Sequence, residues 1–342
     1  MVYRARRAFA RALASQLCLT LACLTPVALT TCSPYDFSKE VGAFSTGVDQ
    51  LSSGFTSGYT ALASDRAALV QLELTSSRAR VAMATSCLAL ASESAQSEVP
   101  CVLYRSGDNP PTLTKIEKAR TETTAFLKGL RDYAHALVAV TNAADRAAYD
   151  AAVGQLASAV GTIAKDAGPQ GAAASTVAPA AVNFVGWIVG TALDQQRFDS
   201  LKAAVNAVGT PLPDGKTIPI DYVAKVAGAG LFALALAQRE VLIKEIDTLT
   251  HPLGPSLTEA EYKKGLSEAQ ALVTVLDGLR QNDPTAAAEG LIEAHKALVA
   301  AVNDPGQNYA SLVKAVADFA DRASALHTAL TATPAAKGST TK

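Results

Sequence analysis

The chain has 342 residues, of which 49% are hydrophobic and 18% charged, and its formal net charge is −1. This hydrophobic content is too high, and the charge too balanced, for a disordered polar chain. The sequence has no basic excess that would attract nucleic-acid phosphates. We therefore expect a globular protein of one large or two modest domains, with no nucleic-acid partner.

The chain begins with a segment typical of export. Residues 1–11 contain four arginines and no acidic residue, and a run of low polarity follows over residues 12–31. A basic start followed by an apolar run is the pattern of a cleaved signal peptide. The sequence therefore predicts that residues 1–31 are removed and that the protein acts outside the cytoplasm.

The segment Leu29-Thr30-Thr31-Cys32 resembles the lipobox of bacterial lipoproteins, in which a Leu lies three positions before a Cys. It departs from the pattern at Thr31, where Gly, Ala or Ser is usual. The resemblance covers only the signal region. It implies a lipid on Cys32 that anchors the protein to a membrane, and Ser33 in place of Asp implies the outer membrane. Ordinary signal cleavage and twin-arginine export remain alternatives, and both also lead out of the cytoplasm.

Loss of the signal peptide changes both the charge and the cysteine count. Removing four arginines from 30 basic residues leaves 26 against 31 acidic ones, a net charge of −5. Cys18 and Cys23 leave with the signal, and Cys32 is the expected lipid site. The two remaining thiols of an exported chain, Cys87 and Cys101, predict a disulfide. Two independent buried thiols are the alternative.

The first predicted helix spans residues 36–91. Its apolar residues recur in alternating steps of three and four, a heptad pattern that is typical of coiled-coil packing. They are Val41, Phe44, Val48, Leu51, Phe55, Leu62, Leu69 and Leu72. Thr114 and Glu117 have the spacing of a capping box and predict the start of a second helix, and a third follows a turn near Asn142.

Residues 168–171, with two glycines and a proline, are the best candidate for a boundary. They divide the mature chain into 32–170, a long helix followed by a helical hairpin, and 171–334, a helical region packed on the first. The tail at 335–342 is small and polar, so we expect it to be disordered.

The second half contains several further helices. The pattern predicts one at 177–208 and another at 220–250, and Ser256 with Glu259 predicts the cap of the next. Asp283-Pro284 and Asp304-Pro305 each combine an N-cap with a first-turn proline. The whole sequence predicts an all-α fold, an elongated antiparallel bundle of about seven or eight helices.

Two segments of the predicted hairpins are similar to each other. Residues 134–142 read AHALVAVTN and residues 294–303 read AHKALVAAVN, so both contain a His after an Ala and both end at an Asn. Duplication of a hairpin explains this similarity, and chance similarity in an Ala-rich chain explains it equally well. For His135 and His295 we expect partly buried, hydrogen-bonded packing roles.

The sequence has none of the common motifs of nucleotide-binding, serine-hydrolase or zinc sites. Its four histidines lie on separate predicted segments, and their spacing matches no known set of metal ligands. We therefore expect that the protein is not an enzyme and uses neither a metal nor a cofactor.

Two apolar stretches, 177–193 and 226–237, contain small residues at spacings that would allow close helix contact. The residues of interest are Phe184, Gly186, Trp187, Gly190, Gly228 and Gly230. Such stretches are typical either of a membrane-inserting hairpin or of core helices. Both are short or interrupted for a membrane span, which favours the core.

These observations predict a lipid-anchored, non-catalytic scaffold or interaction protein of the bacterial cell envelope. Its expected partners are the membrane, through the anchor, and an envelope protein that the sequence does not identify. A membrane-active, pore-forming-like protein that uses 177–193 and 226–237 is the first alternative. A small-ligand binding or sensor bundle is the second.

Overall fold

The protein is described here from a computed structural model, which defines residues 36–77, 81–83, 103–105, 115–167, 192–250 and 258–332. In this part of the chain the fold is an all-α bundle of eight helices with one small two-stranded sheet. The described residues belong to one compact unit. The predicted fold class is therefore confirmed.

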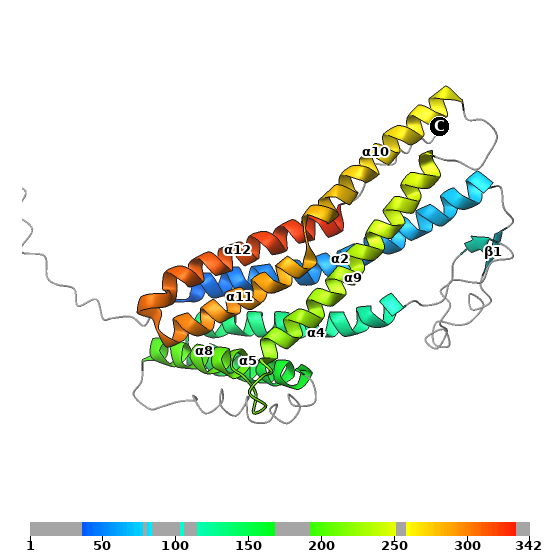
Figure 1. The fold of residues 1–342 in the computed structure, drawn as a ribbon. Helices are drawn as coiled ribbons and strands as arrows, with labels where there is room; N and C mark the ends of the chain where they lie inside the picture. Colours follow the sequence, from blue (N-terminus) through cyan, green and yellow to red (C-terminus); the bar gives the residue numbers. More distant parts are fainter. Residues whose placement is uncertain are drawn as a thin grey trace, which may run out of the picture. The chain divides into compact units, whose positions relative to one another are not determined.

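Figure 1 shows the order of the elements along the chain. The helices are α2 (Ser38–Ser77), α4 (Lys115–Thr141), α5 (Arg146–Asp166), α8 (Leu193–Gly209), α9 (Pro219–Thr250), α10 (Glu259–Gln281), α11 (Pro284–Asn303) and α12 (Pro305–Thr331). The strands are β1 (Val81–Met83) and β2 (Leu103–Arg105).

The first helix is shorter than predicted. Helix α2 ends at Ser77, whereas the sequence predicts a helix that continues to residue 91. Residues 81–83 instead form β1, which pairs antiparallel with β2 so that Val81 lies opposite Arg105. The heptad pattern stops at Leu72, and the Thr-Ser-Ser sequence of residues 75–77 has a weak helix propensity. Beyond Leu72 the sequence therefore provides no heptad packing that would hold the helix.

The heptad face of α2 is buried as predicted up to its last turns. The buried residues are Val41, Phe44, Val48, Leu51, Phe55, Leu62 and Leu69, and Leu72 is half-buried. Tyr59 fills the gap that Gly58 leaves in the pattern and is also buried. The face therefore forms a continuous apolar contact with the rest of the bundle.

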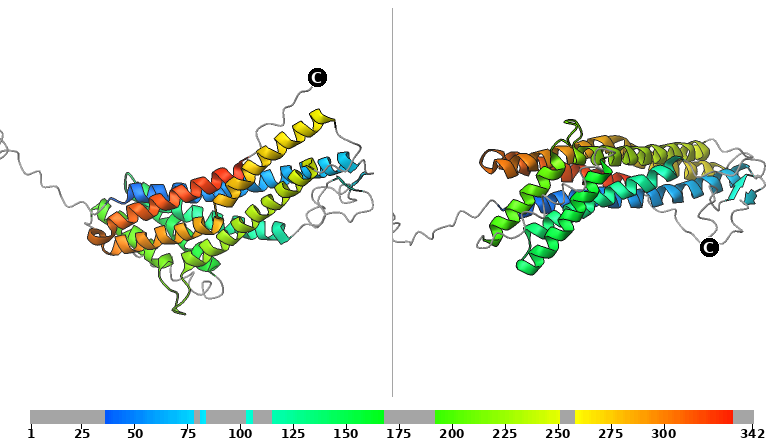
Figure 2. Two further views of the ribbon diagram at one scale, coloured as in Figure 1. Left: turned by 45° about the horizontal axis from the view of Figure 1, so that its top comes forward. Right: turned by 90° about the horizontal axis from the view of Figure 1, so that it is seen from below.

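Helices α2 and α12, the first and last of the described helices, pack side by side and run in the same direction (Figures 1 and 2). Glycines of α2 make the close approach possible. A Cβ atom at Gly47 would lie 2.6 Å from Cε1 of Phe319, and one at Gly58 would lie 3.1 Å from Cβ of Leu330. Helix α11, which directly precedes α12 along the chain, packs antiparallel to it.

Side chains cap several helix starts, and the predicted cap at Asp283 is confirmed, whereas the predicted cap Asp304 makes no side-chain cap hydrogen bond. Asp145 accepts a hydrogen bond from the Ala148 amide at 2.9 Å, and Asp283 accepts one from Thr285 at 2.8 Å. The capping box of α10 lies two residues later than predicted, because Thr258 and Glu261 form it in place of Ser256 and Glu259. Thr258 gives the same spacing to an acid, so the sequence offered two equivalent starts.

Helices from before and after residue 170 share one core. Helix α9 packs on α2 and α4, α12 packs on α2, and α5 packs on α8. The buried apolar residues form a single cluster that draws on all eight described helices. The proposed boundary at 168–171 lies outside the described residues, as does the tail at 335–342.

Candidate interaction surface

One face of α9 is exposed along the whole helix. Exposed positions recur in steps of three and four, and we call them the α9 stripe: Tyr222, Lys225, Ala229, Phe232, Leu236, Glu240, Ile243 and Asp247. This spacing places the residues on one side of a helix. Phe232, Leu236 and Ile243 are 49%, 43% and 52% exposed, which is unusual for large apolar side chains. Exposed large apolar side chains that recur along one helix face, here with Lys225, Glu240 and Asp247 among them, are typical of a binding surface.

The opposite side of α9 holds the helix firmly in the bundle. Gln238 Nε2 donates hydrogen bonds to the carbonyl oxygens of Gly58 in α2 and Leu330 in α12, both at 3.0 Å. Gly230 packs directly on the Thr123 side chain of α4, where any Cβ atom would collide with Thr123. The stripe is therefore displayed by a helix that is fixed on three neighbours.

A cavity of about 360 Å³ lies between α9 and α11, next to the stripe. Its walls are mostly apolar, and the lining residues are Lys225, Gly228, Ala229, Phe232, Thr285, Ala288, Glu289 and Ile292. Gly228 allows the two helices to meet at this point, because a Cβ atom there would lie 2.6 Å from Cβ of Ala288. The cavity has the size and polarity to receive an apolar side chain or a small apolar ligand.

The predicted membrane segments have separate outcomes. Phe184, Gly186, Trp187 and Gly190 lie outside the described residues. Helix α9 is long and apolar enough to cross a membrane, but 61% of its most apolar 18-residue window is buried inside the bundle. Gly228 and Gly230 lie in that helix and contact α11 and α4. In this structure the two glycines therefore serve helix packing.

The interior contains a histidine and a tyrosine that bind each other. The Tyr133 hydroxyl of α4 and Nε2 of His295 in α11 form a hydrogen bond of 2.9 Å, and both side chains are fully buried. Burial lowers the pKa of His295 to about 3 and raises that of Tyr133 well above its usual value. His295 is therefore neutral at physiological pH. Its Nδ1 atom has no hydrogen-bond partner among the described residues.

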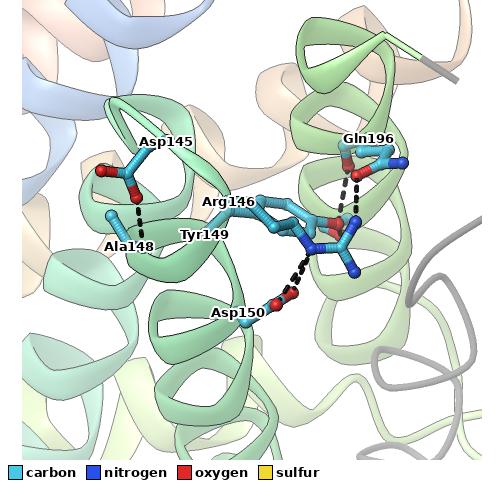
Figure 3. Close-up of polar contacts among 7 residues, drawn as sticks. Asp145, Arg146, Ala148, Tyr149, Asp150 and Gln196 are labelled. Atoms are coloured by element: carbon cyan, nitrogen blue, oxygen red, sulfur yellow. Dashed lines mark hydrogen bonds and ion pairs between the residues drawn. The ribbon is translucent and has the colours of Figure 1, made fainter.

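A second polar group joins α5 to α8 (Figure 3). The Tyr149 hydroxyl donates to the Gln196 carbonyl at 3.2 Å and lies 2.7 Å from Oγ of Ser200. Arg146 binds Asp150 at 2.9 Å and the Gln196 side chain at 3.2 Å. Burial raises the pKa of Tyr149. These contacts fix the packing of α8 on α5.

Polar side chains also connect helices at the surface. His135 Nε2 of α4 lies 2.8 Å from Asp49 of α2, and Lys296 Nζ of α11 lies 3.2 Å from Asp221 of α9. The His, Cys, Asp and Glu residues of the described ranges do not gather in groups of three or more that would hold a metal ion.

The remaining predicted sites lie outside the described residues. They are the signal segment 1–31, the lipid site Cys32, and the disulfide partners Cys87 and Cys101. The α9 stripe was missed by the sequence analysis, because it took 226–237 as an apolar run without a preferred face. The spacing of Phe232, Leu236 and Ile243 is helical. The buried Leu231, Leu234 and Val241 are also spaced helically, so the sequence contains no signal that separates the two faces.

Comparison with known proteins gives no significant match to a family model, to a curated protein or to a solved structure.

Proposed function

We propose that the protein is a non-catalytic scaffold or interaction protein of the bacterial cell envelope, anchored by a lipid on Cys32 and bound to an envelope protein through the α9 stripe. The observation that carries the proposal is the stripe itself. It places three large apolar side chains in water on a helix that the bundle holds in a fixed position. Covering each of them would contribute about 1 kcal/mol to binding.

The polar interior supports a structural role for the bundle. Tyr133 forms a hydrogen bond with His295, and Tyr149 forms one with Ser200, and each pair joins two helices. Buried polar groups that pair in this way fix how helices pack. The bundle would therefore act as a rigid support that presents a surface to a partner.

The anchor can be tested by metabolic labelling with palmitate. The wild-type protein should take up label and sediment with membranes, and Cys32→Ala should lose both properties. Cys23→Ala, which changes a cysteine of the expected signal peptide, is the matched control and should still be labelled. A wild-type protein without label would contradict the lipid anchor.

The stripe can be tested by photo-crosslinking in cells. A photoreactive amino acid at Leu236, 43% exposed, should give a protein adduct in the envelope fraction. Val313 on α12, 40% exposed, provides the matched control, because it is an isolated exposed apolar residue outside the stripe. Equal adducts at both positions, or none at Leu236, would contradict the proposed interaction.

A membrane-active protein is the second candidate, and the length and apolar character of α9 favour it. Insertion would require α9 to leave α2 and α12, which would break both hydrogen bonds of Gln238. Dye release from liposomes by the chain lacking residues 1–32 separates the two proposals. A scaffold should release no dye, whereas a pore-forming protein should empty the vesicles.

A small-ligand binding bundle is the third candidate, and the cavity between α9 and α11 favours it. An apolar fluorescent probe should then bind, and Ala288→Phe should abolish the signal by filling the cavity. Val313→Phe is the control, because it adds an aromatic ring away from the cavity. A probe that binds all three proteins equally would contradict this candidate.

A further inference from the structure

We infer that the partner of the α9 stripe is the α9 stripe of a second copy of this chain, antiparallel to the first and related to it by a two-fold axis at Leu236. This inference rests on the proposed function, because it names the protein that the stripe binds. An axis of this kind makes the same surface serve both copies, as in most protein dimers.

Charge complementarity favours the antiparallel arrangement. When Leu236 faces its own copy, each residue lies opposite the one at equal distance on the other side of position 236. Lys225 then faces Asp247 of the second copy, and this ion pair occurs twice. A parallel arrangement would instead place Lys225 against Lys225 and Asp247 against Asp247. Like charges in contact are unfavourable, so the stripe favours one orientation.

Side-chain size favours the same register. The small Ala229 faces Ile243 of the second copy, and Ala229 lines the cavity between α9 and α11. Ile243 is 52% exposed in the single chain and would enter this cavity on the second copy. Each copy thus supplies an apolar side chain and a cavity for the other. Leu236 meets Leu236 at the centre, where the apolar contact is most protected from water.

The size of the stripe predicts how strongly the copies bind. From Tyr222 to Asp247 the helix is about 38 Å long and about 10 Å wide, so it covers about 400 Å² on each copy. Stable complexes usually bury about 800 Å² on each partner. Residues of α11 around the cavity add to the contact, but the area remains small. We therefore expect a dissociation constant in the micromolar range, which a shared membrane anchor would compensate by concentrating the copies.

A lipid surface fits the stripe less well. Glu240 and Asp247 lie within it, and the expected mature chain carries a net charge of −5. Acidic groups at the contact are repelled by anionic headgroups. Between two copies, Lys225 lies opposite Asp247, whereas Glu240 lies opposite Phe232.

The first test is the molar mass of the full-length protein, measured by sedimentation in mild detergent over a range of concentrations. The wild type should change from one copy to two as the concentration rises. Leu236→Asp should weaken this association at least about tenfold, because it buries two unpaired carboxylates at the axis. Val313→Asp, which adds the same charge outside the stripe, should associate like the wild type. A wild type that stays monomeric, or two variants that behave alike, would overturn the inference.

The second test reverses the charges at the ends of the stripe. Lys225→Glu alone and Asp247→Lys alone should each weaken association about threefold to tenfold, because each places like charges opposite each other. The double variant restores opposite charges and should return to within about twofold of the wild type. Circular dichroism checks that every variant is folded. A double variant that associates no better than the single ones would exclude the antiparallel register.

Crosslinking in cells distinguishes this inference from the proposed function. With the photoreactive group at Leu236, and with light and heavy isotope-labelled copies mixed, the inference predicts an adduct that joins two copies near residue 236. An adduct with a different protein would overturn the inference and leave the proposed function intact. The absence of any protein adduct would overturn both. Crosslinking to lipid alone, together with dye release, would favour the membrane-active candidate.

Discussion

The segments 134–142 in α4 and 294–303 in α11 have similar sequences, yet their histidines occupy opposite environments. His295 is fully buried and binds Tyr133. His135 lies at the surface and pairs with Asp49. Both segments end at an Asn at the C-terminal end of a helix. The difference between the two histidines therefore does not come from their place along the helices.

The burial pattern explains the difference. The two segments match when Leu137 is set against Leu298, because buried and exposed positions then coincide almost throughout. In this register His295 corresponds to Ala134, and His135 corresponds to Lys296. The second segment has one extra residue between its His and the shared Leu-Val-Ala sequence, and one residue turns a helix by about 100°. The two similar sequences therefore place their histidines on different faces of their helices.

The corresponding residues do share a role. His135 and Lys296 both point outward, and each pairs with an aspartate of a neighbouring helix, Asp49 or Asp221. The two segments therefore match in which positions are buried and which are exposed. The residue types at single positions do not show this match. Our expectation of partly buried packing roles for both histidines was wrong for His135, whose side chain is 55% exposed.

The largest expected effect is the pH dependence of stability that the buried His295 causes. Because burial lowers the pKa of His295 to about 3, the unfolded chain binds a proton below pH 6.5 while the folded protein does not. The stability that this neutral group contributes is fully present above pH 6.5 and falls by about 1.4 kcal/mol per pH unit as the pH decreases toward 3. Urea unfolding between pH 7 and 4.5 should therefore show a smaller loss of stability in His295→Gln than in the wild type. Equal pH slopes in the two proteins would contradict the buried neutral histidine.

Truncation of the two side chains should differ clearly. His295→Ala leaves a cavity and removes the partner of the Tyr133 hydroxyl, so it should lower the free energy of unfolding by about 3 kcal/mol. His135→Ala removes an exposed pair and should cost about 0.5 kcal/mol. Urea unfolding at pH 7.5 measures both. Similar losses would mean that the two histidines do not differ in environment.

The packing around His295 can be tested at Gly209 of α8. A Cβ atom there would lie 2.9 Å from Cε1 of His295 and would also collide with Val299. Gly209→Ala should therefore destabilise the protein by about 2 kcal/mol. Gly154→Ala in α5 is the matched control, because nothing lies within 4 Å of its Cβ position. It should stabilise the protein by about 0.5 kcal/mol through helix propensity. Thermal unfolding that ranks the two variants the other way would refute this packing.

The smallest effect concerns the outward-facing pairs of Lys296 with Asp221 and of His135 with Asp49. The Asp221 side chain is only 12% exposed, and its Oδ1 atom has no hydrogen-bond partner among the described residues. A double-mutant cycle of Lys296 and Asp221 to Ala should give a coupling of about 1 kcal/mol. The more exposed pair of His135 and Asp49 should give about 0.3 kcal/mol. A larger coupling for the second pair would contradict the difference in burial.

Periodicity predicted most of the fold because burial follows it closely. The face from Val41 to Leu69 was predicted from spacing alone and is buried. Asp283 caps α11 as predicted, since capping depends only on nearby residues. The end of α2 was predicted too late, because Ala-rich sequence beyond Leu72 still has a helical composition while tertiary contact decides where the helix stops.

The candidate surface was harder to predict. The run 226–237 is apolar all round, so sequence alone does not show which side faces water. The side that packs is determined by distant partners such as Thr123 beside Gly230 and the two carbonyl oxygens that Gln238 binds. The pairing of Tyr133 with His295 joins residues 162 positions apart, and no local pattern reports such a contact.

The pairing of α2 with α12 also sets the order in which the protein can be built. Because Gly47 and Gly58 have no side chain, they leave room for Phe319 and Leu330, which are among the last described residues of the chain. While the ribosome is still making the earlier helices, the heptad face of α2 has no α12 to cover it. Contacts between residues so far apart in sequence also slow folding. The nascent chain would therefore leave this face of α2 uncovered until α12 has been made, which leaves time for other factors to bind α2.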